Sequence, residues 1–138
     1  MGLFDGLAGS KDIKLSPKGA LALAAMTVIG IDGAIEDDEL SGLNRIVRGD
    51  VEAFDQAFKI YKDKPIQDCI TIVSQTLDQK QKSATIAVLL DLAMSDGMLA
   101  GAEKKLLTAY VNNFQLSEGI VKNIVDVISA KNNFALFE

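Results

Sequence analysis

Two short acidic segments carry the residues that could do chemistry in this sequence. The first, residues 31–39, reads IDGAIEDDE and holds five carboxylates with no basic residue between them. The second begins at Asp96-Gly97, and in both segments a glutamate follows the aspartate by seven residues. This Asp-Gly-x5-Glu spacing matches the second half of a calcium-binding EF-hand loop. A complete EF-hand is not expected, because Val28 and Gly30 stand where the first half of such a loop has carboxylates.

Two interpretations of these segments stay open from the residues themselves. Carboxylate oxygens are the ligands that hard divalent cations prefer, so the segments could bind Ca²⁺ or Mg²⁺. Alternatively, the glycines end helices, and carboxylates in the first turn of the next helix stabilise its positive dipole end. Asp37 or Asp38 would then act as a helix N-cap. Capping explains less well why five mutually repelling carboxylates stand together and why the spacing recurs.

The amino-acid composition narrows the remaining chemistry. The 138-residue chain contains no His and a single Cys, Cys69, which excludes a His-based metal site, an imidazole base and an intrachain disulfide. No Ser/His/Asp set can form, and no glycine-rich phosphate loop follows a strand-like segment. We therefore expect a protein that is not an enzyme, with Cys69 as an unreactive core residue.

The charge and hydropathy of the chain indicate which partners and which cellular location to expect. The net charge of −5, from 14 basic and 19 acidic residues, argues against nucleic-acid binding, which needs a basic surface. The longest apolar stretch, residues 19–31, has 13 residues, whereas a membrane-spanning helix needs about 20. Residues 1–7 lack the basic region of a signal peptide, so we expect a cytoplasmic protein. Leu3, Phe4 and Leu7 fall at helical spacing, which favours a short helix packed on its own domain over a weak membrane or partner contact.

The elements that must position the acidic segments are helices. Ser16-Pro17 is a helix start signal, and each Asp-Gly pair follows a nearly continuous apolar run. Alternating β-branched runs and hairpin signals do not occur. The pattern predicts an all-α compact bundle of about seven helices, near residues 17–31, 37–48, 51–61, 65–77, 79–95, 101–114 and 117–130. We assign residues 1–15 to an N-terminal segment, 16–130 to a helical domain and 131–138 to a C-terminal tail.

An internal repeat relates the two acidic segments. When the sequence is shifted by 64 residues, residues 20–47 lie on residues 84–111, and each copy has an apolar helix, an Asp-Gly turn and an amphipathic helix. This duplication of a helical hairpin predicts a pseudo-two-fold arrangement in which the two apolar helices contact each other. Asp91 lies inside the second apolar run, where an unpaired buried carboxylate would be costly. We expect it at the helix edge or hydrogen-bonded, with a contribution to an acidic site as the alternative.

The repeated arrangement, Asp32-Gly33-x5-Glu39 and then Met94-Ser95-Asp96-Gly97-x5-Glu103, resembles the TerB-like family, named for tellurite-resistance protein B. The resemblance covers residues 16–130 and implies an all-α domain built from a duplicated helical unit. It also implies a bacterial stress-response protein linked to tellurite resistance, with divalent-metal binding near the acidic segments. Members of this family look like partners of membrane-associated complexes. The metal ligands that the resemblance implies are Asp32, Glu36, Glu39, Asp96 and Glu103.

These observations lead to two functional hypotheses. In the first, a non-enzymatic TerB-like protein binds Ca²⁺ or Mg²⁺ weakly through its acidic segments and acts in a stress response with a protein partner, a membrane-associated complex being one candidate. In the second, the chain is a helical interaction module, with a homodimer as one candidate form, and the acidic segments only cap helices. The hypotheses differ in whether replacing Asp32 and Asp96 by Asn abolishes a cation-dependent gain in stability.

Overall fold

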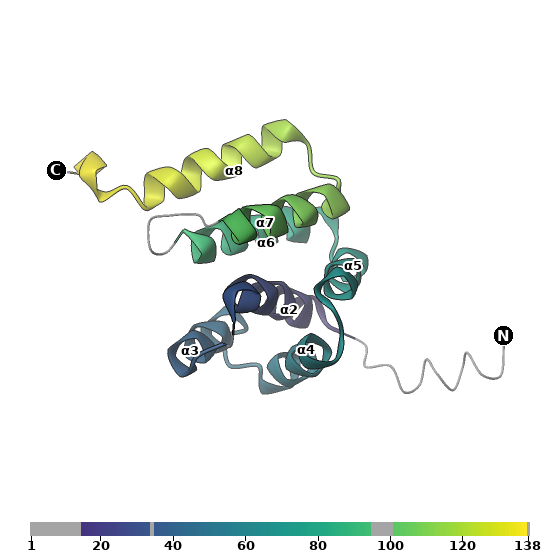
Figure 1. Ribbon diagram of the computed structural model, residues 1–138. Coiled ribbons are helices and arrows are strands. Elements are labelled where there is room, and N and C mark those ends of the chain that lie inside the picture. The colour runs from purple at the N-terminus through teal and green to yellow at the C-terminus, as the bar shows by residue number, and fades with distance from the viewer. Residues whose placement is uncertain (1–14, 34, 95–100, 138) are drawn as a thin grey trace.

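The computed structural model describes residues 15–33, 35–94 and 101–137 (Figure 1). Within these residues all regular structure is helical, which confirms the expected all-α class. The α-helices are α2 (Pro17–Ile29), α3 (Asp37–Ile46), α4 (Val51–Asp63), α5 (Ile66–Thr76), α6 (Gln79–Ala93), α7 (Gly101–Phe114) and α8 (Glu118–Lys131). Two 3-10 helices, η1 (Gly30–Asp32) and η2 (Phe134–Phe137), follow α2 and α8.

Helix α2 is the centre of the bundle. The Ser16 hydroxyl accepts the backbone N–H of Gly19 at 3.0 Å, and Pro17 occupies the first helical position, so the start signal in the sequence acts as expected. Every residue from Ala22 to Val28 is buried, and α2 contacts α3, α4, α5, α6 and α7 (Figure 1). Its long apolar run is thus explained by neighbouring helices on most of its sides. No helix in the described part of the chain is long and apolar enough to cross a membrane.

Helix α6 connects the central helix α2 to the outer part of the bundle. It contacts α2, α7 and α8, and α8 runs along the outer edge of the molecule (Figure 1). The packing of α2 on α6 confirms the expected contact between the apolar runs at residues 20–31 and 84–94. The duplication of a helical hairpin itself stays a prediction from the sequence.

Helices α2, α3 and α6 each end two residues earlier than the sequence pattern indicates, and for α2 and α3 the backbone shows why. The first ends at Ile29, because Gly30–Asp32 tightens into η1. The second ends at Ile46 because Arg48, with φ of 55°, and Gly49, with φ of 77°, adopt the left-handed backbone that terminates a helix. Ile31 and Val47 continue the apolar patterns just past the two helix ends, so hydropathy alone made both helices look longer.

Aspartates start two further helices. The Asp50 carboxylate accepts the N–H of Ala53 at 3.1 Å at the start of α4, and the Asp78 carboxylate accepts the N–H of Gln81 at 2.8 Å at the start of α6. These caps fix where α4 and α6 begin, and therefore which residues of each helix face α2.

Candidate functional site

The first acidic segment joins α2 to α3. After η1 the chain turns at Gly33, whose φ of 149° is a backbone conformation that residues with side chains rarely adopt. Among the residues that the structure describes, and apart from the chain neighbours of Gly33, no atom lies within 4 Å of the position that a Gly33 Cβ would take, so backbone conformation rather than space requires glycine there. The side chain of Asp32 lies outside the part of the chain that the structure describes, and its role as a ligand stays a prediction.

Two carboxylates of this segment bind backbone N–H groups at the start of α3. Oε1 of Glu39 accepts the N–H of Glu36 at 2.8 Å, and Oδ1 of Asp38 accepts the N–H of Glu39 at 3.1 Å. The first turn of a helix leaves such N–H groups without partners inside the helix. Carboxylates thus cap this helix start, but the N-cap is Glu36, paired with Glu39 in a capping box. The expectation that Asp37 or Asp38 would be the N-cap is wrong.

The remaining candidate ligands are placed as follows. Glu36 is exposed, Glu39 is half-buried, and Glu103 is half-buried in the first turn of α7. Asp96 lies outside the described residues. Among residues 15–33, 35–94 and 101–137, no three Asp, Glu or Cys side chains gather in a way that could hold a metal ion. The contact between η1 and α7 places the turn of the first segment beside the helix that follows the second.

Asp91 lies at the edge of α6 and is hydrogen-bonded, which confirms the interpretation favoured from the sequence. Its carboxylate accepts hydrogen bonds from Nζ of Lys131 and from Nδ2 of Asn132, each at 3.1 Å. Partial burial raises the pKa of the Asp91 carboxyl, but the hydrogen bonds from Asn132 and Lys131 and the charge of Lys131 together lower it by more. Asp91 thus fastens α6 to the end of α8.

A buried polar cluster lies where α2, α4, α5 and α7 meet. The hydroxyl oxygens of Thr27 in α2 and Tyr110 in α7 are 2.6 Å apart. Burial raises the pKa values of Tyr110, of Tyr61 in α4 and of the Cys69 thiol in α5. A thiol that is fully buried with a raised pKa has little nucleophilic thiolate, so Cys69 is a core residue as expected.

Sequence reasoning did not single out the two tyrosines of this cluster. The Tyr61 hydroxyl lies where a Cβ on Gly30 would be, so Gly30 is required by this close approach. One signal was available in the repeat: Gly30 aligns with Met94, and Tyr110 aligns with Ile46.

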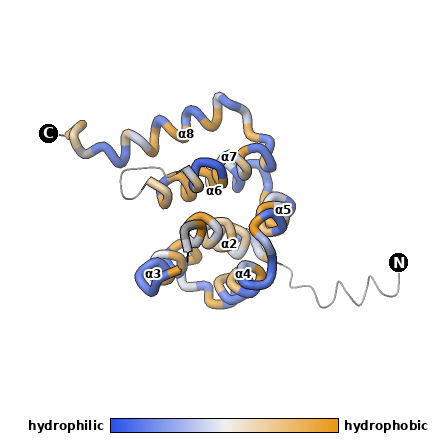
Figure 2. Tube along the Cα trace, in the orientation of Figure 1, coloured by the Kyte–Doolittle hydropathy of each residue, from blue (hydrophilic) through white to orange (hydrophobic). Residues whose placement is uncertain are grey.

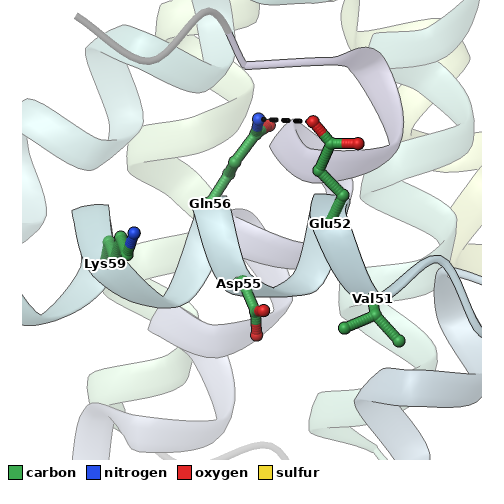
Figure 3. A pocket seen from close by; sticks show the side chains of 5 residues that line it. All are labelled: Val51, Glu52, Asp55, Gln56 and Lys59. Carbon is green, nitrogen blue, oxygen red and sulfur yellow. Dashed lines mark hydrogen bonds between the residues drawn. The ribbon is translucent and has the colours of Figure 1, made fainter. Parts of the chain in front are cut away.

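The outer face of α4 forms a shallow open hollow (Figure 3). It is lined by Val51, Glu52, Asp55, Gln56 and Lys59. The Gln56 amide donates to the Glu52 carboxylate at 3.5 Å, while Asp55 points away from this pair (Figure 3). Because all five residues come from one exposed helix face, the hollow does not enclose a substrate or bring an acid and a base together.

Large apolar side chains remain exposed at the C-terminal edge of the bundle. Ile120 and Val127 lie two turns apart on α8, and Leu136 and Phe137 follow in η2. The exposed fractions of Val127 and Phe137 are 65% and 81%. Figure 2 shows apolar residues recurring along α8, which lies at the edge of the molecule. We call Ile120, Val127, Leu136 and Phe137 the outer apolar surface.

No protein-family model, curated protein or solved structure matches this chain. The resemblance to the TerB-like family therefore rests on the two acidic segments and their spacing in the sequence. The arguments about function rest on the geometry described above.

Proposed function

We propose that this protein is a non-enzymatic helical interaction module that associates with a second copy of itself through α8 and η2. The observation that supports the proposal most directly is the outer apolar surface, four exposed apolar side chains on the last two elements of the described chain, α8 and η2. Large apolar side chains that stay exposed to water are typical of contact surfaces when they lie side by side. Membership of the TerB-like family and a role in a bacterial stress response belong to the same proposal and are supported by the sequence resemblance.

The charges of α8 favour a second copy as the partner. Glu118, Lys122, Asp126 and Lys131 give this helix two charges of each sign, so two copies would meet here without net repulsion. An antiparallel pairing about a two-fold axis would bring Glu118 of one copy near Lys131 of the other. It would also set the two helix dipoles in opposite directions. Ile120 and Val127 would then form the apolar line between the two helices.

Sedimentation velocity from micromolar to millimolar protein tests this association. We expect a concentration-dependent dimer for the wild-type chain and a monomer for Val127→Glu, because a carboxylate in an apolar contact is costly to desolvate. Val51→Glu is the matched control, since Val51 on α4 is 64% exposed and Val127 is 65% exposed. A wild-type chain that stays monomeric over the whole range contradicts the proposal, as does a dimer that Val127→Glu leaves intact.

Weak binding of Ca²⁺ or Mg²⁺ by the acidic segments is a second candidate function. Glu36, Asp37 and Asp38 are all exposed at the start of α3, where their like charges repel one another unless a cation lies near. The contact of η1 with α7 also supports this candidate, because the first turn of α7 carries Glu103. The ligands in this candidate are Asp32, Glu36 and Glu39, with Asp96 and Glu103.

Thermal melting of metal-stripped protein across Ca²⁺ and Mg²⁺ titrations tests the second candidate. A cation at about 100 times its Kd would add about 2.7 kcal/mol to the free energy of unfolding. The expected result is a saturable rise in Tm that a chain with both Asp32→Asn and Asp96→Asn lacks. If millimolar concentrations of either ion leave the Tm of the wild-type chain unchanged, cation binding is refuted. The proposed self-association is unaffected by that result, because sedimentation velocity tests it separately.

A further inference from the structure

An apolar groove with a volume of about 220 Å³ lies between the first turns of α2 and the first half of α6. Its walls include Pro17 and Leu21 of α2, Leu77 ahead of α6, and Ala84 and Val88 of α6. At about 30 Å³ for each water molecule, the groove has room for about seven waters. One or two large apolar side chains would displace that water.

The two long polar side chains in the groove wall turn their polar ends elsewhere. Nζ of Lys18 lies 3.7 Å from Oδ2 of Asp50, at the start of α4. Oε1 of Gln81 accepts the backbone N–H of Asp78 at 2.8 Å, as part of the cap of α6. Lys18 and Gln81 therefore line the groove with their aliphatic stems. The groove consequently favours an apolar occupant over a polar or charged one.

The chain enters α2 at the edge of this groove. Ser16 caps the helix through its bond to the N–H of Gly19, and the Leu15 side chain packs over Gly19. The next residue, Pro17, is itself part of the groove wall. The segment that precedes Leu15 is thus tethered within two residues of the groove.

We propose that the groove is the docking site for the apolar side chains of Leu3, Phe4 and Leu7 in the N-terminal segment of this same chain. Leu7 and Leu15 are eight positions apart in sequence, and an extended chain spans about 3.3 Å per residue. The resulting reach of about 26 Å allows these side chains to return to a groove that begins at Pro17. Docking of this kind goes beyond self-association, because it concerns a different surface and an intramolecular partner.

Composition and tethering both favour this occupant over a separate molecule. Residues 1–14 carry two acidic and two basic residues, so the acidic protein does not repel them through net charge. Gly9 and Ser10 stand between the apolar residues and Leu15, where they permit the chain to reverse direction. A short tether also holds the segment at an effective concentration in the millimolar range. Contact by only a few side chains is then enough to fill the groove.

Nuclear Overhauser contacts in the full chain test the docking directly. We expect contacts between the ring protons of Phe4 and the methyl groups of Leu21 and Val88. Ala84→Glu places a carboxylate in the exposed part of the groove wall and should abolish these contacts. Ser83→Glu puts the same charge beside it on α6, outside the groove wall, and should preserve them.

Two further measurements distinguish docking of the N-terminal segment from other ways of filling the groove. In a mixture of isotope-labelled and unlabelled chains, contacts that cross between chains would identify a second copy in the groove and overturn the proposal. Contacts of Phe4 with the methyl groups of α8, or none with Leu21 and Val88, would overturn it as well. If Ala84→Glu does not fold, a chain with Leu3, Phe4 and Leu7 replaced by Ser gives the deciding readout. Docking requires that this chain shift the methyl resonances of Leu21 and Val88, and unshifted resonances refute it.

Discussion

The hydroxyl oxygen of Tyr110 lies 2.6 Å from that of Thr27, and the Thr27 hydroxyl lies 2.6 Å from the carbonyl oxygen of Ala24. A carbonyl oxygen can only accept, so Thr27 donates its proton to Ala24 and Tyr110 donates to Thr27. Thr27 and Tyr110 are both fully buried. A directed chain of two hydrogen bonds therefore joins α7 to α2 away from water, where such bonds are costly to break.

Because the hydrogen bonds run in this direction, two conservative substitutions should lower the free energy of unfolding by different amounts. Thr27→Val leaves the Tyr110 hydroxyl buried without its acceptor and should lower the free energy of unfolding by about 1–3 kcal/mol. Tyr110→Phe removes one bond but leaves Thr27 bonded to Ala24, so the loss should be about 1 kcal/mol. The double variant should lose less than the sum of the two. Urea unfolding of the three variants measures this, and a larger loss for Tyr110→Phe would show that the bond runs the other way.

The raised pKa of Tyr110 should make the protein less stable at high pH. A tyrosine hydroxyl has an ordinary pKa of 10.0, and the pKa in the folded protein is higher. At a pH between the unfolded and the folded pKa of Tyr110, the unfolded chain holds fewer protons than the folded one. The stability that the protonated Tyr110 contributes is therefore fully present below about pH 10 and is lost as the pH rises further. The raised pKa values of Tyr61 and Cys69 act with the same sign.

Urea unfolding at several pH values between about 8 and about 11 measures this effect. The wild-type free energy of unfolding should fall across the upper part of the range. Tyr110→Phe removes one of the titrating groups, so its curve should fall less steeply. Parallel curves for the two proteins would mean that Tyr110 does not contribute to the alkaline loss.

Gly30→Ala should destabilise the fold, because the new Cβ would overlap the hydroxyl of Tyr61. The half-buried tyrosine must then shift, and crowding of this kind costs about 1–2 kcal/mol. Adding Tyr61→Phe removes the overlapping oxygen and should recover part of the loss. Gly42→Ala is the control, since within the described part of the chain no atom beyond its neighbours and the α3 backbone lies within 4 Å of its Cβ position. Alanine there should stabilise the helix by about 0.5–1 kcal/mol. Equal effects at both glycines would argue against the Tyr61 contact.

The sequence predicts the helices well because their signals are local. Ser16 and Asp50 each act on an N–H three residues away, so a short window of sequence contains both partners. The bond between Thr27 and Tyr110 joins positions that are 83 residues apart, and no pattern in the sequence pairs a threonine in one apolar helix with a tyrosine in another. Such a bond depends on how α2 and α7 pack, which is set by the whole core.

The same distinction applies to the candidate site. The sequence indicated that a carboxylate caps the start of α3 but placed the cap at Asp37 or Asp38, because adjacent carboxylates are all suitable caps and only the backbone shows that the helix begins directly after Glu36. Whether Glu103 approaches these carboxylates depends on the placement of α7 against η1, which local signals do not encode. For Asp91 the sequence indicated a need for partners, and the structure supplied them from 40 and 41 residues away.

Substitutions at Glu39 separate a capping role from a charge-dependent one. Glu39→Ala removes the acceptor of the Glu36 N–H and should lower the free energy of unfolding by about 1 kcal/mol. Glu39→Gln keeps an oxygen that can accept the same bond, so in metal-free buffer its loss should be about half as large or less. Thermal and urea unfolding measure both variants. If glutamine costs as much as alanine, the negative charge rather than the hydrogen bond is what the helix start requires.

Asp91 should hold α8 against α6 in a pH-dependent way. The pKa of its carboxyl is lowered from the ordinary value of 3.8, so the stability that it supplies is present above that value and is lost as the pH falls through the folded-state pKa. Its side chain is 39% exposed, so solvent screens the pair with Lys131 and Asp91→Asn should cost only about 0.5–1 kcal/mol at neutral pH. The loss should shrink in acid, where the wild-type carboxylate is protonated as well.

Asp126→Asn changes an exposed carboxylate on α8 itself and is the control. Amide hydrogen exchange should show faster opening of α8 for Asp91→Asn than for Asp126→Asn, and equal rates would mean that Asp91 does not fasten the helix.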